Sequence, residues 1–129
     1  MAVVLSVLYV ALGGAIGSAL RYGVNISAPR LLGHDFPWAT LTVNVVGSFA
    51  MGFLAAFLVE KYADQPDLRL FLTTGVLGGF TTFSAFSLDV FGLVHRGESS
   101  MAVIYALASV VLSIIAVFSG FMISRTLTT

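Results

Sequence analysis

The sequence TTGVLGGFTTFSAFS, residues 73–87, decides the fold of this chain. It carries no charged side chain, so it can lie within a lipid bilayer. Its glycines and its run of Ser and Thr make it a poor continuous helix, because glycine costs about 1 kcal/mol relative to alanine inside a helix. A membrane segment that interrupts its own helix is tolerated only where the freed backbone is buried in protein or lines a cavity. We therefore expect ions to meet the protein here.

Hydrophobic residues make up 58% of the 129 residues and charged residues only 9%, whereas a soluble domain has about 25% charged residues. A helix needs about 20 apolar residues to cross a bilayer core. Four uncharged apolar stretches have about this length, residues 1–20, 36–59, 70–88 and 99–124. We predict an all-α integral membrane protein, a single domain over residues 1–129, with four transmembrane helices and the third broken in mid-membrane. The first stretch lacks the basic region of a signal peptide, which predicts a retained helix.

Several classes of protein are excluded by what the chain lacks. It has no cysteine, which excludes disulfides and thiolate metal sites. Its net charge is zero, so no nucleic-acid partner is indicated. No Ser/His/Asp set and no pair of carboxylates lies within the apolar stretches, and His34 and His95 fall in connections. We therefore do not expect an enzyme.

The cations are balanced between the two sides of the predicted membrane. An excess of Lys and Arg on one side normally sets the orientation of a membrane protein. Without that excess the chain can insert both ways, and two opposite copies can meet as an antiparallel, dual-topology homodimer with two-fold symmetry. The alternative is that so few cations balance by chance. Each side has three: Lys61, Arg69 and Arg125 with the termini, and Arg21, Arg30 and Arg96 opposite.

Two columns of polar side chains run along otherwise apolar helices at the spacing i, i+4, i+8. An unpartnered amide such as that of Asn44 costs several kcal/mol in hydrocarbon. Hydrogen bonds between helices would explain it, and a hydroxyl can also bond to its own helix. Two matching columns favour a third explanation, in which the polar side chains line a water-filled pathway. The columns are Thr40, Asn44 and Ser48 in the second stretch and Tyr105, Ser109 and Ser113 in the fourth.

Small residues four apart, Gly13 and Gly17, predict close packing of the first helix. Arg21 continues the same face one turn later. An arginine at the end of a span can extend its side chain to the membrane interface or stand at a pore mouth and attract anions, and the sequence leaves both open. Asp89 lies toward the same membrane side as Arg21, which predicts a salt bridge between them.

Residues 78–87, GGFTTFSAFS, resemble the signature GG-x-(T/S)TFS-(T/S)-F-S of the Fluc (CrcB) fluoride-channel family. Residues 39–44, ATLTVN, resemble the family's second-span motif, with Ala39 where the family commonly has glycine. Gly17-x-x-x-Arg21 resembles the end of the family's first span. The match covers all four spans. Ala85 departs from it, because the family usually has a hydroxyl there.

The resemblance implies a dual-topology homodimer with two antiparallel pores and passive export of fluoride from the cytoplasm across the cell inner (plasma) membrane. It also implies a structural sodium ion at the centre of the dimer, held by the backbone carbonyls of Gly78 and Thr81 from both protomers.

The resemblance further assigns residues to an anion pore. Fluoride is small and strongly hydrated, so a pore has to replace its water with donors, which amides, hydroxyls and the positive edges of Phe rings can supply. None of these is a fixed cation, and conduction requires that the ion can leave. The implied pore residues are Asn44, Phe83, Phe86, Tyr105, Ser109 and Ser113, with Thr82 nearby, and we add Thr40 and Arg21 from the patterns above.

A small four-helix multidrug or cation antiporter, also often of dual topology, is the alternative. Proton-coupled antiport requires a titratable carboxylate inside the membrane, and Asp89 near the end of a span is the only candidate. A subunit that only stabilises a larger complex would leave the two polar columns unexplained.

Overall fold

The computed structural model describes all 129 residues, and every regular element is a helix. Helix α1 runs over Ala2–Leu32, α2 over Trp38–Lys61 and α6 over Ser99–Thr128. The segment Pro66–His95 contains α3 (Pro66–Leu70), the π-helical segment η1 (Phe71–Leu77), α4 (Gly78–Phe80) and α5 (Phe83–His95). When Pro66–His95 is counted as one segment, four helical segments are long and apolar enough to cross a membrane, as the composition predicts.

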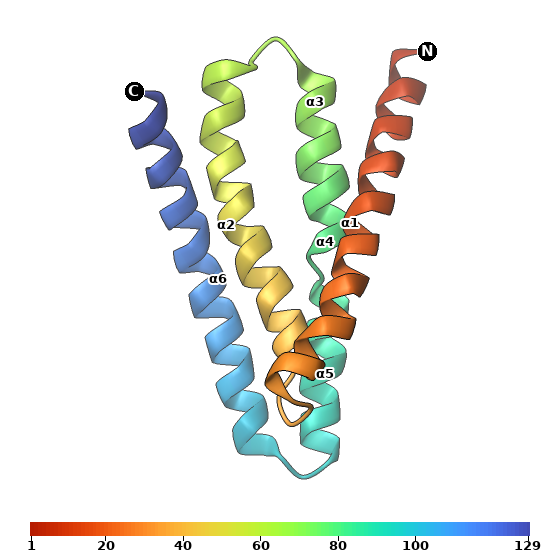
Figure 1. The fold of residues 1–129 in the computed structure, drawn as a ribbon, viewed down its shortest axis with the longest axis vertical. Coiled ribbons are helices and arrows are strands. Elements are labelled where there is room, and N and C mark those ends of the chain that lie inside the picture. The colour runs from red at the N-terminus through yellow and green to blue at the C-terminus, as the bar shows by residue number, and fades with distance from the viewer.

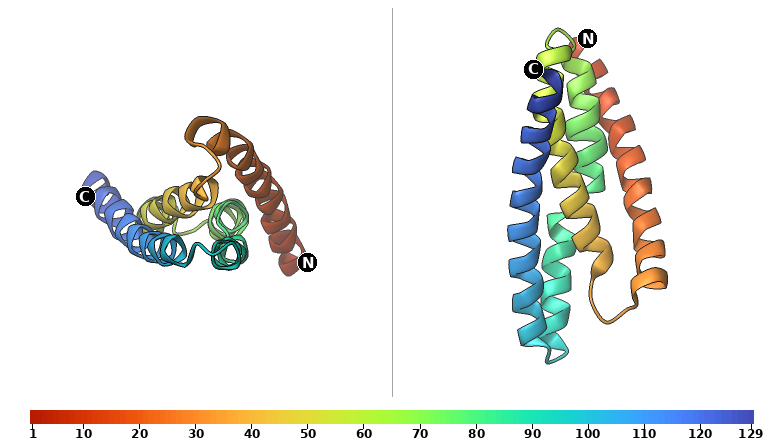
Figure 2. Two further views of the ribbon diagram at one scale, coloured as in Figure 1. Left: turned by 90° about the horizontal axis from the view of Figure 1, so that it is seen from below. Right: turned by 60° about the vertical axis from the view of Figure 1, so that its left-hand side comes forward.

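The four segments form a bundle in which both termini lie at one end, together with the connection between α2 and α3 (Figure 1). The connections from α1 to α2 and from α5 to α6 lie at the other end. Helix α2 packs chiefly on α6, and α1 packs chiefly on η1 and α4. The chain therefore consists of two close helix pairs, and α1 stands apart from α6 in the view along the bundle (Figure 2).

Helix α1 extends beyond the apolar stretch that predicted it. The prediction placed a connection at residues 21–35, but α1 continues to Leu32 and the connection begins at Gly33. An apolar stretch marks the part of a helix that suits lipid, whereas the helix itself ends where the backbone changes direction. Gly33 has φ 91°, a conformation that favours glycine. Arg21 and Arg30 consequently lie on α1 and not in a connection.

The helix in residues 66–80 runs through the glycines that were expected to interrupt it. It ends at Phe80, and the next helix begins at Phe83. Between them Thr81 and Thr82 are extended, with ψ values of 158° and 118°; the gap is visible between α4 and α5 in Figure 2. We refer to these two residues as the Thr81–Thr82 connection.

The glycines serve instead to bring backbones together. A Cβ atom added at Gly79 would lie 2.6 Å from the carbonyl oxygen of Gly14, and one at Gly13 would lie 2.5 Å from that of Phe71. A Cβ at Gly17 would collide with the carbonyl oxygen of Val76. The predicted packing face of Gly13 and Gly17 is therefore confirmed, and it lies against η1 and α4.

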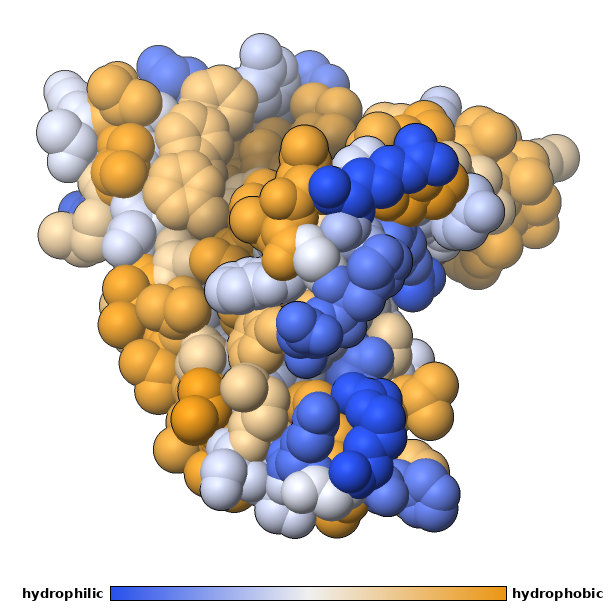
Figure 3. Space-filling view, turned by 60° about the horizontal axis from the view of Figure 1, so that its bottom comes forward, coloured by the Kyte–Doolittle hydropathy of each residue, from blue (hydrophilic) through white to orange (hydrophobic).

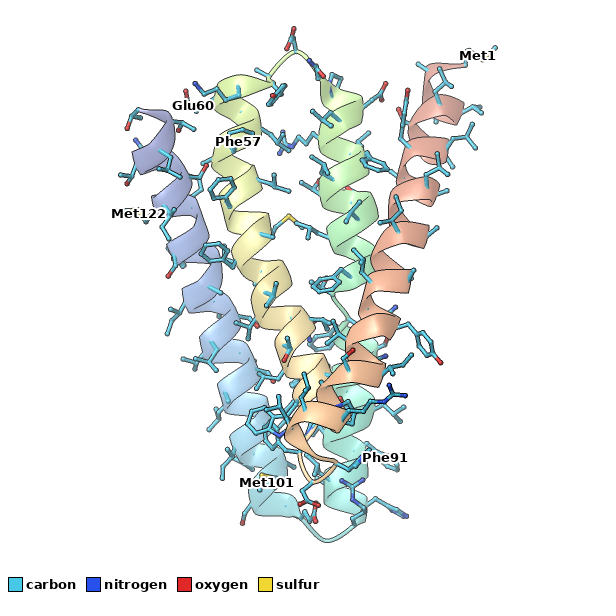
Figure 4. The ribbon with its side chains drawn as sticks, viewed as in Figure 1. Met1, Phe57, Glu60, Phe91, Met101 and Met122 are labelled. Carbon is cyan, nitrogen blue, oxygen red and sulfur yellow. The ribbon has the colours of Figure 1, made fainter.

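Most of the apolar surface points outward. Only 18 of the 129 residues are buried, and Phe91 and Met122, labelled in Figure 4, point away from the bundle with exposed fractions of 62% and 61%. Figure 3, which brings the end with residues 33–37 forward, shows hydrophilic residues gathered there and hydrophobic residues over the flanks. Water-soluble monomers rarely expose apolar surface on this scale. Such flanks suit lipid or a second protein chain.

Candidate functional site

A groove of about 320 Å³ lies between α2, α6 and the start of α5. Half of its lining residues carry an amide or a hydroxyl, and none carries a charge. The lining residues are Asn44, Gly47, Ser48 and Met51 of α2, Thr81, Thr82, Phe83 and Phe86 of the third span, and Ser109, Val110, Ser113 and Val117 of α6.

The groove unites part of each predicted polar column. Asn44 and Ser48 face Ser109 and Ser113 across it. Thr40 and Tyr105, the first member of each column, are buried but do not line the groove. Four residues exceed one helical turn of about 3.6 residues, so an i, i+4 column drifts around its helix. Its first member is therefore rotated away from the surface that its later members share.

Asn44 holds the Thr81–Thr82 connection with both ends of its amide. Its Nδ2 donates to the carbonyl oxygen of Thr82 at 3.0 Å, and its Oδ1 accepts the Thr82 N–H at 2.8 Å. Thr82 in turn caps α5, because its Oγ1 accepts the N–H of Ala85 at 3.1 Å. Ala85 itself does not line the groove. One N–H of Asn44 stays free to donate.

Ser109 presents an unused hydroxyl at the groove. It is only 5% exposed, and its Oγ lies near the Tyr105 hydroxyl but makes no hydrogen bond of good geometry. Buried polar atoms are almost always hydrogen-bonded. The other buried side-chain oxygen without a partner, that of Ser124, belongs to a residue of the same helix that does not line the groove. Ser109 is therefore the lining residue best prepared to bind an ion or a water molecule.

An aromatic series leads away from the groove. The ring centroids of Phe83 and Phe86 lie 5.5 Å apart, and those of Phe86 and Tyr105 lie 5.3 Å apart. Phe36 meets Tyr105 edge-on at 5.4 Å. The edges of aromatic rings carry positive potential. The series thus links the groove to the connection at residues 33–37 through Tyr105, which is fully buried.

The predicted salt bridge between Arg21 and Asp89 is wrong. Arg21 Nε donates to the carbonyl oxygen of Gly79 at 3.0 Å, and Asp89 Oδ2 accepts from the Tyr105 hydroxyl at 2.9 Å. Arg21 lies on α1 against α4, whereas Asp89 lies on α5 beside α6. The only ion pair, Arg96–Glu98 at 3.6 Å, is exposed.

The sequence patterns did not predict that Asp89 contacts Tyr105, the first member of the polar column in α6. The spacing could have indicated this contact, because Asp89 follows Phe86 by three residues and so shares its helix face. Tyr105 contacts both of them. Arg21, by contrast, neither lines the groove nor extends freely to the interface, since it is half-buried and bonded to a backbone oxygen.

The end of α4 frees backbone oxygens. In a continuous helix the carbonyl of Gly78 would accept the N–H of Thr82, and that of Thr81 would accept the N–H of Ala85. Both donors bond elsewhere, to Asn44 Oδ1 and to Thr82 Oγ1. Carbonyl oxygens released in this way are suitable ligands for a hard cation. No cluster of His, Cys, Asp or Glu could hold a metal ion.

Four long apolar helical segments, three of which line an uncharged polar groove, define a multi-pass membrane protein. The chain belongs to the CrcB-like family (CrcB-like protein, Camphor Resistance), whose profile matches residues 8–121. The resemblance seen in the sequence is thereby confirmed.

Three relatives of this chain carry the name fluoride-specific ion channel FluC. The protein of Rhizobium etli is 57% identical over 120 residues, covering 93% of this chain and 96% of the relative. That of Methylobacterium is 54% identical over 121 residues, covering 94% and 97%. That of Agrobacterium fabrum is 50% identical over 123 residues, covering 95% and 98%.

Proposed function

We propose that this protein is a fluoride-selective ion channel, and not an enzyme, that lets fluoride leave the cytoplasm passively across the cell inner membrane. The observation that carries the proposal is the uncharged groove in which a free amide N–H of Asn44 and the unpartnered hydroxyl of Ser109 meet. The name shared by the relatives supports fluoride as the ion.

The lining suits the chemistry of this anion. Fluoride holds its water strongly, so a path has to offer hydrogen-bond donors in exchange. Asn44, Ser109 and Ser113 offer N–H and O–H donors, and Phe83 and Phe86 offer ring edges. Because no fixed cation lines the groove, binding stays weak enough for the ion to move on.

We further propose that two copies assemble in antiparallel orientation. Phe83 lines the groove and yet is 77% exposed in the single chain, so the groove is open on one side. A second copy would cover Phe83 and close the path, and lipid would cover the remaining flanks. With Arg21 held against α4, the two sides differ by only one cation, and so small a bias supports insertion in both orientations.

The third span would then be broken at mid-membrane by the Thr81–Thr82 connection. We propose that the carbonyls of Gly78 and Thr81 of both protomers hold a structural sodium ion there, since both oxygens lack their helical donors. A bound cation is often the largest local charge in a site. It would link the protomers and make the potential between the two pores more positive.

The test is ion flux from liposomes that contain the purified protein. We expect fluoride to leave down its gradient far faster than chloride, whereas empty liposomes retain both. Equal rates, or none, would contradict the channel. An antiporter would instead accumulate a cationic dye when a proton gradient is imposed, which the same liposomes can measure.

A further inference from the structure

Arg21 reaches the end of α4 from the neighbouring helix. Gly17, one turn before Arg21, lies so close to α4 that an added Cβ would be 2.8 Å from the backbone nitrogen of Phe80. Gly79 lies equally close to α1 at Gly14. This contact brings the Arg21 side chain to the last turn before the Thr81–Thr82 connection, where Nε bonds to Gly79 O at 3.0 Å.

That carbonyl belongs to a helix end. Three carbonyls of α4 point toward residues that no longer continue the helix, and a helix C-terminus carries partial negative charge. A basic side chain there can donate to a terminal carbonyl. Arg21 takes the carbonyl of Gly79, while Asn44 of α2 holds the backbone of Thr82 from the other side. The connection is thus fixed between α1 and α2.

We propose that Arg21 is a positioning residue of the anion path: its Nε–H holds the end of α4, and so keeps Thr82 and Phe83 at the groove. The inference rests on the proposed fluoride channel. The role belongs to the Nε–H donor and not to the positive charge, because Nε makes the only hydrogen bond of this side chain and Arg21 does not line the groove. Attraction of anions by the guanidinium charge is the competing role.

Three substitutions separate the donor from the charge. In Arg21→Gln a side-chain N–H₂ stands at the position of Nε without the charge. In Arg21→Lys the charge is kept but a carbon atom takes the place of Nε, and Arg21→Met has neither. Each variant is purified, checked for the same elution as wild type, and assayed for fluoride efflux from liposomes.

We expect Arg21→Gln to stay within about threefold of wild type, and Arg21→Lys and Arg21→Met to lose roughly tenfold or more, the range for a hydrogen bond with a charged partner. Near-normal flux in Arg21→Lys with loss in Arg21→Gln would overturn the proposal in favour of charge. Equal flux in all three variants, whether normal or lost, would also overturn it.

Two further readouts do not depend on flux. Amide hydrogen exchange in residues 81–86 should rise in Arg21→Met and Arg21→Lys but not in Arg21→Gln, with α6 unchanged as the internal control. In the wild-type protein, one of the five arginine Nε–H groups should exchange slowly with water, since the other four arginines are exposed. Fast exchange of all five would overturn the proposal even if every variant misfolds. If wild type passes no fluoride, the channel fails while these readouts still test the contact.

Discussion

At the scale of single residues, the groove is distinguished by one buried polar atom, Ser109 Oγ, that lacks a partner. Ser109 and Ser124 lie on the same helix, and both have buried hydroxyls without a hydrogen bond. Only Ser109 lines the groove. A buried unpaired hydroxyl costs stability, and its place in the wall of the groove agrees with the ion path proposed above.

Replacing this hydroxyl should affect flux without weakening the fold. Ser109→Ala removes one donor from the path, and we expect fluoride efflux from liposomes to fall roughly tenfold, the effect of losing one hydrogen bond to a charged group. The thermal midpoint in detergent should be unchanged or higher, because an unpaired polar atom is removed. Ser124→Ala is the matched control and should keep normal flux. Equal effects of the two substitutions would exclude a special role for Ser109.

At the scale of elements, α1 is held to the third span by backbone contact. The glycines on each side leave no room for a side chain: Gly13 and Gly17 lie against η1 and α4, and Gly79 lies against Gly14. Two polar contacts supplement this pairing: Ser6 Oγ donates to Asp67 Oδ1 of α3 at 3.1 Å, and Arg21 Nε donates to Gly79 O at 3.0 Å. The position of α4, and with it the Thr81–Thr82 connection, therefore depends on how closely α1 can approach.

A methyl group in this contact should separate the two helices. In Gly17→Ala the added carbon would collide with Val76 O, and overpacking of this kind costs about 1–3 kcal/mol, which exceeds the gain of about 1 kcal/mol from better helix propensity. We expect a lower midpoint of thermal unfolding and reduced flux. Gly23→Ala, in the same helix with nothing within 4 Å, is the control and should be at least as stable as wild type. A stable, active Gly17→Ala would contradict the tight contact.

At the scale of the whole molecule, the single chain leaves its site incomplete. The groove is open where Phe83 is exposed, and few residues are buried. Because Arg21 is held against α4, the cations near the two ends differ by one, Lys61, Arg69 and Arg125 against Arg30 and Arg96. A second copy in the opposite orientation would cover Phe83 and close the open side of the groove, which is the arrangement proposed above.

Cations added at one end should therefore fix the orientation of the chain and prevent a single variant from forming the antiparallel dimer. Thr126→Lys with Thr129→Lys adds cations at the end with the termini, and His34→Lys with Asp35→Lys adds them at the other end; all four positions are exposed. We expect each double variant alone to insert in one orientation and to lose fluoride resistance in cells. Co-expression of the two should restore it, and a C-terminal reporter should show opposite sides for each. Full resistance from either variant alone would contradict the antiparallel dimer.

Much of the fold follows from the sequence. The four apolar stretches, the packing face of Gly13 and Gly17, and the region of residues 73–87 in which the third segment leaves the helix are all local patterns of hydropathy, spacing and residue type. Such patterns act within one helix, so they hold whatever the neighbours are. The groove was predicted in part for the same reason, because Asn44 and Ser109 were found in regular polar columns.

What only the tertiary structure decided is which atoms of different helices meet. The glycines of the third segment do not stop the helix, since α1 packs against them; the interruption comes at Thr81 and Thr82, where Asn44 supplies substitute hydrogen bonds. Arg21 finds a carbonyl in place of the expected carboxylate because helix rotation and separation set its partner, and these depend on packing across the bundle. The sequence determined the helices and their polar faces, while their close approach determined the site.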